Sequence, residues 1–93
     1  MEIAYKINDV LSIADVYKIK GMIQNDLENF ELSEELFENS VRLNDDLGSN
    51  LNKAESINEL SSLYEKADQQ EKSEDLKRVA NQYFQKIQSS DND

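Results

Sequence analysis

Ser33 and Ser73 come closest to a catalytic pattern in this sequence, because each hydroxyl is followed directly by two carboxylates. The motifs read Ser-Glu-Glu and Ser-Glu-Asp, which suggests either a nucleophile or a phosphorylation site. A serine nucleophile needs a neighbouring base and a donor that stabilises the oxyanion. The sequence has no histidine and no glycine-rich elbow to provide them. We therefore interpret both serines as small residues that pack on the inner face of a helix.

The segment 44–50, NDDLGSN, has some features of a calcium loop, because it combines acidic and amide side chains with a glycine. With Gly48 in the glycine position, the first, fifth and twelfth ligand positions fall on Leu43, Leu47 and Ala54. None of these side chains carries an oxygen that could bind calcium. The segment therefore predicts the end of a helix with its turn, and we expect neither a metal nor another cofactor.

Three pairs of adjacent acids, at 34–35, 45–46 and 74–75, could form an acid–base dyad. Adjacent residues of a helix point about 100° apart, so such neighbours do not share one site. The pairs at 34–35 and 74–75 instead suit the positive end of the helix dipole. The sequence also lacks cysteine, which excludes thiolate nucleophiles, while the missing histidine excludes imidazole bases and the usual zinc sites. We predict that the protein is not an enzyme.

The composition favours one all-helical domain. The chain has 93 residues, no proline and only two glycines, as expected for a small domain without helix breakers. The net charge of −10 argues against nucleic-acid binding, since phosphate contacts need clustered basic residues. No apolar run approaches the length of about eighteen residues that spans a membrane, and no basic-then-apolar leader opens the chain. We expect a cytoplasmic protein.

A repeat with a period of forty residues organises the chain. Residues 31–47, ELSEELFENSVRLNDDL, align with residues 71–87, EKSEDLKRVANQYFQKI. The identical positions are Glu31 and Glu71, Ser33 and Ser73, Glu34 and Glu74, and Leu36 and Leu76. Positions 40, 43 and 47 also keep size class or polarity in the second copy. The shared positions 33, 36, 40, 43 and 47 step by three and four and therefore line one face of a helix. Such self-similarity is typical of helical repeat arrays.

Helix signals divide the chain into two hairpins, at 10–47 and 50–88. Gly48 is expected to end a helix in the left-handed conformation. Asp68 and Glu71 form an Asp-x-x-Glu capping box, which is expected to start the last helix. Because the turns are short, the helices should be antiparallel neighbours. The expected helices are 10–25, 30–47, 51–66 and 68–87.

The two ends of the chain are also predicted from the repeat. At the forty-residue shift, residues 1–9 align with the end of a second helix, so we expect the tail of a preceding helix and a break near Asn8–Asp9. One unbroken helix from Ile3 to Gln24 is the alternative, because apolar residues continue at helical spacing. Residues 89–93, SSDND, are expected to form a disordered polar tail.

Helix 10–25 carries apolar residues on more than one side. One stripe contains Val10, Ala14, Tyr17 and Gly21, and the other contains Ile13, Val16, Ile19 and Ile23. A helix of this kind has neighbours on more than one side. Glycine inside a helix costs about 1 kcal/mol relative to alanine. Gly21 therefore predicts that another helix approaches closely, and Ser61 is the small residue at the equivalent position.

The spacing of small and bulky residues over 10–88 resembles a tetratricopeptide repeat in its longer form. The positions that carry the resemblance are Tyr17, Gly21, Phe30, Ser33, Phe37 and Ser40 in the first hairpin, and Leu60, Ser61, Tyr64, Ser73, Leu76 and Ala80 in the second. Glu28 and Asp68 stand where the family has a turn glycine. The resemblance implies hairpins stacked as a short right-handed α-solenoid, in contrast to a plain antiparallel four-helix bundle.

The resemblance also implies function, namely a protein–protein interaction scaffold that is a fragment of a longer repeat protein. The alternative is a regulatory or sensory segment of a signal-transduction or transcription regulator. The implied groove lies on the inner side of the first helix of each hairpin, and its expected residues are Asp15, Lys18, Ile19, Met22, Asn25, Glu55, Asn58, Glu59, Ser62 and Glu65. An ordinary solvated helix face is the other interpretation of these residues.

The mixed apolar and acidic composition of this groove favours a basic or amphipathic peptide or partner helix. The terminal helices carry further apolar side chains at Ile3, Ile7, Val79 and Phe84. Repeat arrays usually cover such residues with neighbouring units. We therefore expect the isolated chain to self-associate.

Overall fold

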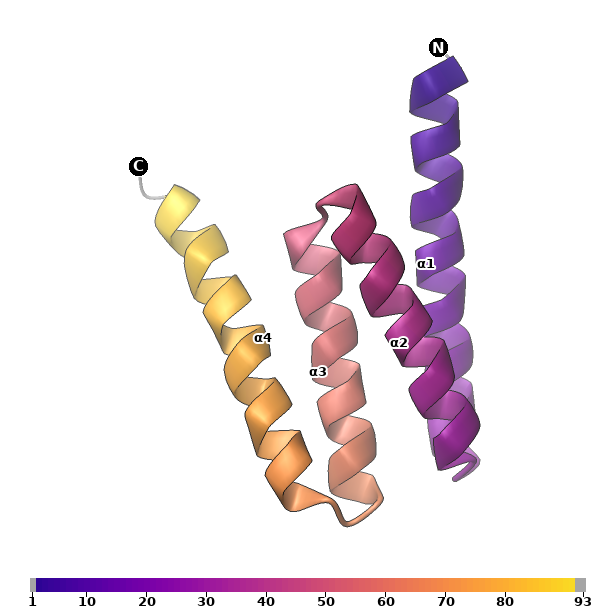
Figure 1. Cartoon of the computed structure of the whole chain (residues 1–93), viewed down its shortest axis with the longest axis vertical. Helices are drawn as coiled ribbons and strands as arrows, with labels where there is room; N and C mark the ends of the chain where they lie inside the picture. Colours follow the sequence, from indigo (N-terminus) through magenta and orange to yellow (C-terminus); the bar gives the residue numbers. More distant parts are fainter. Residues whose placement is uncertain (1, 92–93) are drawn as a thin grey trace.

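The computed structural model describes the fold of residues 2–91 and the side chains of residues 13–88. Within that range the chain forms four α-helices and no strand, which confirms the all-α prediction (Figure 1). The helices are α1 (Glu2–Asp26), α2 (Phe30–Leu47), α3 (Asn50–Lys66) and α4 (Gln70–Asp91). Turns of two or three residues join them, so consecutive helices run antiparallel.

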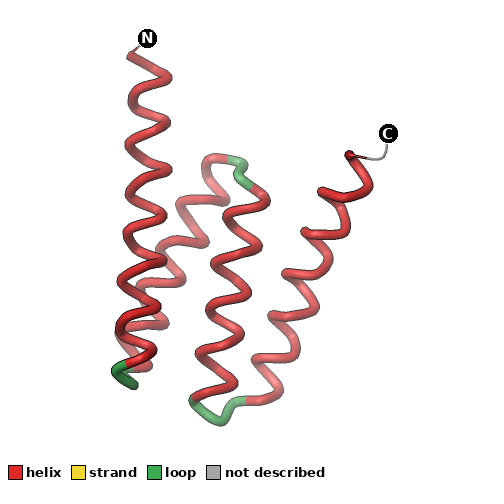
Figure 2. Tube along the Cα trace, turned by 180° about the vertical axis from the view of Figure 1, so that it is seen from behind, coloured by secondary structure: helices red, strands yellow, loops and turns green. Residues whose placement is uncertain are grey.

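The helices are arranged in a row in which each packs against the next in sequence (Figures 1 and 2). α1 also touches α3, whereas over the described residues the backbone of α4 approaches neither α1 nor α2. In a closed four-helix bundle the first and last helices would be in contact. The row is correspondingly flat, with extents of 44 × 31 × 16 Å.

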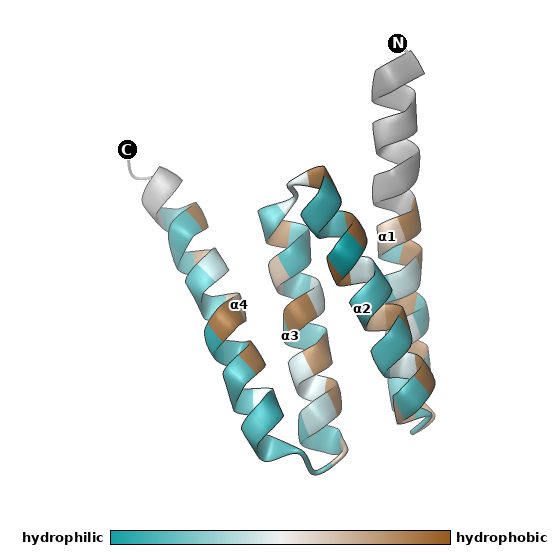
Figure 3. Cartoon of the chain, viewed as in Figure 1, coloured by the Kyte–Doolittle hydropathy of each residue, from teal (hydrophilic) through white to brown (hydrophobic). Residues whose placement is uncertain are grey.

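The core forms where α3 lies between α2 and α4. Its buried members are Phe37, Leu60, Leu63 and Tyr64, with Phe30 and Leu76 packed against them. Hydrophobic residues are correspondingly frequent along α3, while α4 is mostly hydrophilic (Figure 3). On α2 the buried residues are Ser33, Phe37, Ser40 and Asn44, spaced by four, three and four, which is one helix face.

The two hairpins end their first helices in the same way. Glu28 and Asp68, forty positions apart, both adopt a left-handed backbone with φ of 64°. The helix-ending hydrogen bonds also correspond, with Asn29 N–H donating to Gln24 O at 2.9 Å and Gln69 N–H donating to Tyr64 O at 2.7 Å. Gly48, with φ of 71°, ends α2 as predicted. These bonds satisfy carbonyls that the helix end leaves free.

The predicted capping box at Asp68 is wrong. Because Asp68 takes the left-handed position that ends α3, the N-cap position of α4 falls one residue later, on Gln69. The N–H of Ser73 accordingly donates to the carbonyl of Gln69 at 3.1 Å. Termination of the preceding helix has overridden the local Asp-x-x-Glu signal.

Both predicted chain ends differ from the structure. α1 runs without a break through Asn8–Asp9, so the unbroken-helix alternative is correct and residues 2–9 are not the tail of a separate helix. No glycine or proline interrupts this stretch, and each added residue gains a backbone hydrogen bond. For the same reason α4 continues to Asp91, so residues 89–91 are helical. Residues 92–93 of the predicted tail, like Met1, lie outside the described residues.

Helices α1 and α2 approach closely at Gly21, as predicted. A Cβ atom on Gly21 would lie only 2.7 Å from the ring of Phe37. The Oγ of Ser33 donates to the carbonyl of Gly21 at 2.6 Å. At the equivalent positions of the second hairpin, Ser61 Oγ donates to the carbonyl of Ser73 at 2.8 Å. The same two positions therefore meet in both hairpins.

Candidate partner-binding surfaces

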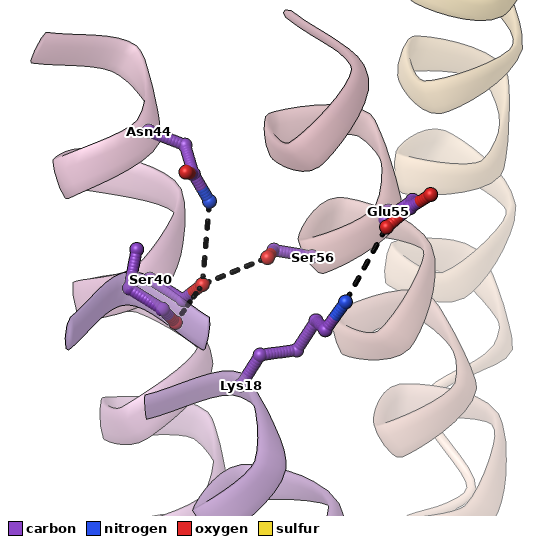
Figure 4. A network of polar contacts seen from close by, with 6 residues as sticks. Lys18, Ser40, Asn44, Glu55 and Ser56 are labelled. Atoms are coloured by element: carbon purple, nitrogen blue, oxygen red, sulfur yellow. Dashed lines mark hydrogen bonds and ion pairs between the residues drawn. The ribbon is translucent and has the colours of Figure 1, made fainter. Parts of the chain in front are cut away.

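The two halves of the predicted groove meet at Lys18 on α1 and Glu55 on α3. Their side chains form an ion pair of 3.3 Å, and Lys18 is largely covered (Figure 4). The sequence places these residues 37 positions apart, and the contact between α1 and α3 brings them together. This pair neutralises the lysine that the sequence would otherwise offer to an acidic partner.

Asn25 is not a surface residue of the groove, contrary to the prediction. Its side chain is buried, and its backbone carbonyl accepts a hydrogen bond from Lys66 Nζ at 3.1 Å. Its Oδ1 atom is buried and has no hydrogen-bond partner among the described residues. Asn25 therefore belongs to the packing between the ends of α1 and α3.

The remaining predicted groove residues leave a surface that we call the inner face. Its exposed residues are Asp15, Ile19, Met22, Asn58, Ser62 and Glu65, and Glu59 is half-buried beside them. Ile19 and Met22 keep 54% and 40% of their surface exposed. Glu65 pairs with Lys77 Nζ at 3.1 Å on an exposed part of α4. The inner face combines two exposed apolar residues of α1 with acidic residues.

A second concave surface was not predicted from the sequence. It is a groove of about 360 Å³ between α2 and α4, whose backbones do not approach each other over the described residues, with α3 beneath them. Its apolar residues are Val41, Ile57, Leu60 and Leu76, and its charged residues are Glu38, Arg42, Asp45 and Lys53. Ile57 and Leu60 lie on the opposite side of α3 from Asn58 and Ser62, so the groove and the inner face are separate.

Lys53, on α3, forms hydrogen bonds with residues of α2 and α4 beside this groove. Its Nζ donates to Asp45 Oδ1 and to the Tyr83 hydroxyl, both at 2.7 Å, and lies 4.8 Å from the centre of the Tyr83 ring. The hydrogen bond to Asp45, followed by the one to Tyr83, raises the pKa of Lys53. The lysine is consequently charged at neutral pH and engaged within the protein.

Ser40 is the centre of a buried polar contact between α1, α2 and α3 (Figure 4). Its Oγ donates to the carbonyl of Ala14 at 2.9 Å and lies 2.8 Å from Ser56 Oγ. A hydroxyl has one proton, so Ser56 must be the donor to Ser40. Asn44 Nδ2 is a third, longer contact at 3.5 Å. Ser40, Ser56 and Asn44 are all nearly inaccessible to solvent, which makes them packing groups.

The serines and acids whose sequence pattern suggested catalysis contribute to helix packing or lie beside packed residues. Ser33 and Ser73 are fully buried and hydrogen-bonded between helices, as predicted for packing residues. Glu34 lies beside Tyr64, whose pKa is raised by burial and further by this carboxylate. Among the described residues, no group of three or more acids is arranged to hold a metal ion.

No described helix is long and apolar enough to cross a membrane. A comparison with protein families, curated proteins and solved structures finds no match to this chain.

Proposed function

We propose that the protein is a non-catalytic interaction scaffold of the tetratricopeptide type, which binds a basic or amphipathic peptide or partner helix. The observation that carries the proposal is the equivalence of the two hairpins. Glu28 and Asp68 share one backbone conformation. The equivalent pairs Gly21–Ser33 and Ser61–Ser73 each form a serine-to-carbonyl hydrogen bond between helices, in opposite directions in the two hairpins. Stacked equivalent hairpins are the building principle of helical repeat scaffolds.

The open row of helices supports a short solenoid as the architecture. Because α1 and α4 do not meet within the described residues, the inner face is not closed off as the interior of a bundle would be. Scaffolds of this kind present such faces to extended peptides or helices.

The composition of the inner face defines the partner. Ile19 and Met22 offer exposed apolar surface. Asp15 and Glu59 supply negative charge beside it, whereas Glu65 is paired with Lys77. Lys18 is already paired with Glu55. A net charge of −10 attracts basic partners over the distance of a Debye length and repels acidic ones.

A titration with two model peptides tests this proposal. One is an amphipathic helix of leucine and lysine, and the other has glutamate in place of each lysine. In NMR spectra of the ¹⁵N-labelled chain, the lysine peptide should shift the amide signals of Asp15, Ile19, Met22, Asn58 and Ser62, and the glutamate peptide should not. Binding should weaken as salt is added, because opposite charges attract.

Two double variants distinguish peptide binding at the inner face from non-specific binding to exposed apolar residues. Ile19→Gln with Met22→Gln should weaken binding of the lysine peptide by about tenfold or more. Leu32→Gln with Val79→Gln removes similarly exposed apolar groups elsewhere and should leave binding unchanged. Equal losses in the two variants, or equal binding of the two peptides, would disprove the proposed site.

A further inference from the structure

One side of α1 is apolar and uncovered, and we call it the outer face. It consists of Ile13, Val16, Ile23 and Leu27, which are 48%, 47%, 52% and 63% exposed. Ile19 of the inner face lies next to Val16 and Ile23 and forms the border between the two faces. Ala14 and Gly21, on the other side of α1, are buried against α2. The sequence pattern predicted that other helices pack on more than one side of α1. In the described structure, helices cover only the side that contains Ala14 and Gly21.

The opposite end of the row differs in character. The free side of α4 is formed mostly by charged and amide side chains, and Val79 is its only exposed large apolar residue among the described side chains. Most residues of α4 are hydrophilic, as the colours of Figure 3 show. If a second copy packed its α1 against α4, the apolar outer face would be matched with a polar one. Stacking of the α1 helix of one copy on the α4 helix of another is therefore disfavoured. Contact between the outer faces of two copies instead buries apolar residues against apolar residues.

The overall charge distribution permits the same contact, in which the like charge of Lys20 in the two copies is kept toward solvent by its long side chain. α1 carries four acids and three bases, whereas α2 carries six acids and a single arginine. The most acidic helix therefore lies behind α1, away from the outer face. In a pair joined through α1, the two α2 axes would be about 25–30 Å apart, which is three helix-packing distances. Repulsion over this distance is screened at physiological ionic strength and is felt only in dilute salt.

We propose that a second copy of this chain covers the outer face, forming a two-fold symmetric dimer in which α1 packs against α1. A two-fold contact buries both apolar faces and leaves the polar α4 helices at the ends, so assembly stops at two copies. The segment 13–27 is about 22 Å long, which makes the interface small. The dissociation constant is expected to be on the order of micromolar or weaker.

Sedimentation equilibrium of the full 93-residue chain tests the dimer between about 5 µM and about 500 µM. The native chain should pass from monomer to dimer and no further. Dimerisation should strengthen when salt is raised from about 0.05 M to about 0.5 M. This is the opposite of the salt effect expected for a basic peptide on the inner face, so the two proposals fail independently.

Matched variants locate the contact. Val16→Gln with Ile23→Gln keeps the charge and does not lower the helix propensity, and it should leave a monomer throughout. Leu32→Gln with Leu51→Gln removes comparably exposed apolar groups from α2 and α3 and should dimerise like the native chain. Far-ultraviolet circular dichroism at low concentration shows whether each variant is folded. Dimerisation of the first variant, loss of the dimer in the second, or growth beyond two copies would overturn the proposal.

A crosslinking measurement tests the symmetry. Lys20 lies between Val16 and Ile23 on the same side of α1, and the sequence has no cysteine. A two-fold contact brings position 20 of one copy close to position 20 of the other. Lys20→Cys should therefore give a disulfide-linked dimer under mild oxidation, while Lys86→Cys on α4 should remain largely monomeric. Equal crosslinking at the two positions would contradict the α1–α1 contact.

Discussion

Ser40 on α2 and Ser56 on α3 share a hydrogen bond of 2.8 Å between their Oγ atoms, in a place that solvent does not reach. Ser40 simultaneously donates to the carbonyl of Ala14 on α1. One hydroxyl thus satisfies polar groups from two other helices. Buried polar groups of this kind contribute little while they are paired and cost much when one partner is removed.

Ser40→Ala should therefore destabilise the protein by about 1–3 kcal/mol, because Ser56 and the Ala14 carbonyl lose their partner. Adding Ser56→Ala should recover part of the loss, since the second orphaned hydroxyl is then removed. Urea denaturation followed by circular dichroism measures both changes. Ser62→Ala, at an exposed position, is the control and should change stability by less than about 0.5 kcal/mol. An effect of Ser40→Ala as small as that of the control would contradict the role assigned to Ser40.

Gly21→Ala should destabilise the fold by about 1–3 kcal/mol even though alanine is the better helix former. The reason is the 2.7 Å approach between the added Cβ atom and the ring of Phe37. Phe37→Leu removes the ring, so the double variant should be more stable than the two single effects predict. The control is Gly48→Ala, which meets no atom but has φ of 71°. Its cost should not depend on Phe37.

Glu28→Gly and Asp68→Gly should each stabilise the protein by about 0.5–1 kcal/mol. Both residues have a positive φ, which costs about 1–2 kcal/mol for an L-residue, and the greater freedom of glycine in the unfolded chain offsets part of the gain. Equivalent turns predict equal effects at the two positions, as measured by thermal unfolding. Glu31→Gly, inside α2, is the control and should be destabilising. A destabilising change at either turn would refute the strain that we assign to it.

Stability should fall in alkaline solution. The folded protein raises the pKa of Lys53 through Asp45 and Tyr83, and it raises the pKa of Tyr64 through burial and Glu34. The folded state therefore holds these protons more tightly than the unfolded state. This stabilisation is complete below the unfolded values of 10.0 for Tyr64 and 10.5 for Lys53, and it is lost as pH rises above them.

Urea unfolding at a series of pH values measures this dependence. Tyr64→Phe should make it shallower, because the buried phenol no longer ionises on unfolding. Tyr17→Phe removes the hydroxyl of a half-buried tyrosine on α1 and serves as the comparison. If Tyr64→Phe leaves the alkaline decline unchanged, burial of the phenol is not its cause.

The sequence predicted helix α2 to the residue, because Gly48 gives an unambiguous end and the apolar period is regular. The same repeat gave a wrong prediction for the first helix, namely a break near Asn8–Asp9. The equivalent of Gly48 there is Asn8, and without a glycine the α1 helix simply continues. Periodicity therefore fixes where helices can form, and it fixes where they stop only when a residue with a clear backbone preference is present.

The site was less predictable than the fold. Asn25 was placed on the inner face by its spacing along α1, but the crossing of α1 and α3 turns it into the interior. The groove over Ile57 and Leu60 depends on the separation of α2 and α4. Crossing angles and helix separations are properties of packing that one helix pattern does not contain. Lys18 and Glu55 could likewise be placed on the groove side of their helices from the sequence, but the ion pair between them could not be predicted.

The row in which each helix packs mainly on its neighbour in sequence also sets how the chain folds. Contacts between residues near in sequence close short loops, so the entropy barrier is low and folding should be fast for a chain of this length. Among the described residues the backbone of α4 packs against α3 alone, so α4 can detach while the other three helices remain assembled. The amide hydrogens of α4 should therefore exchange with solvent faster than those at the centre of α3. They would exchange through local unfolding of α4 alone.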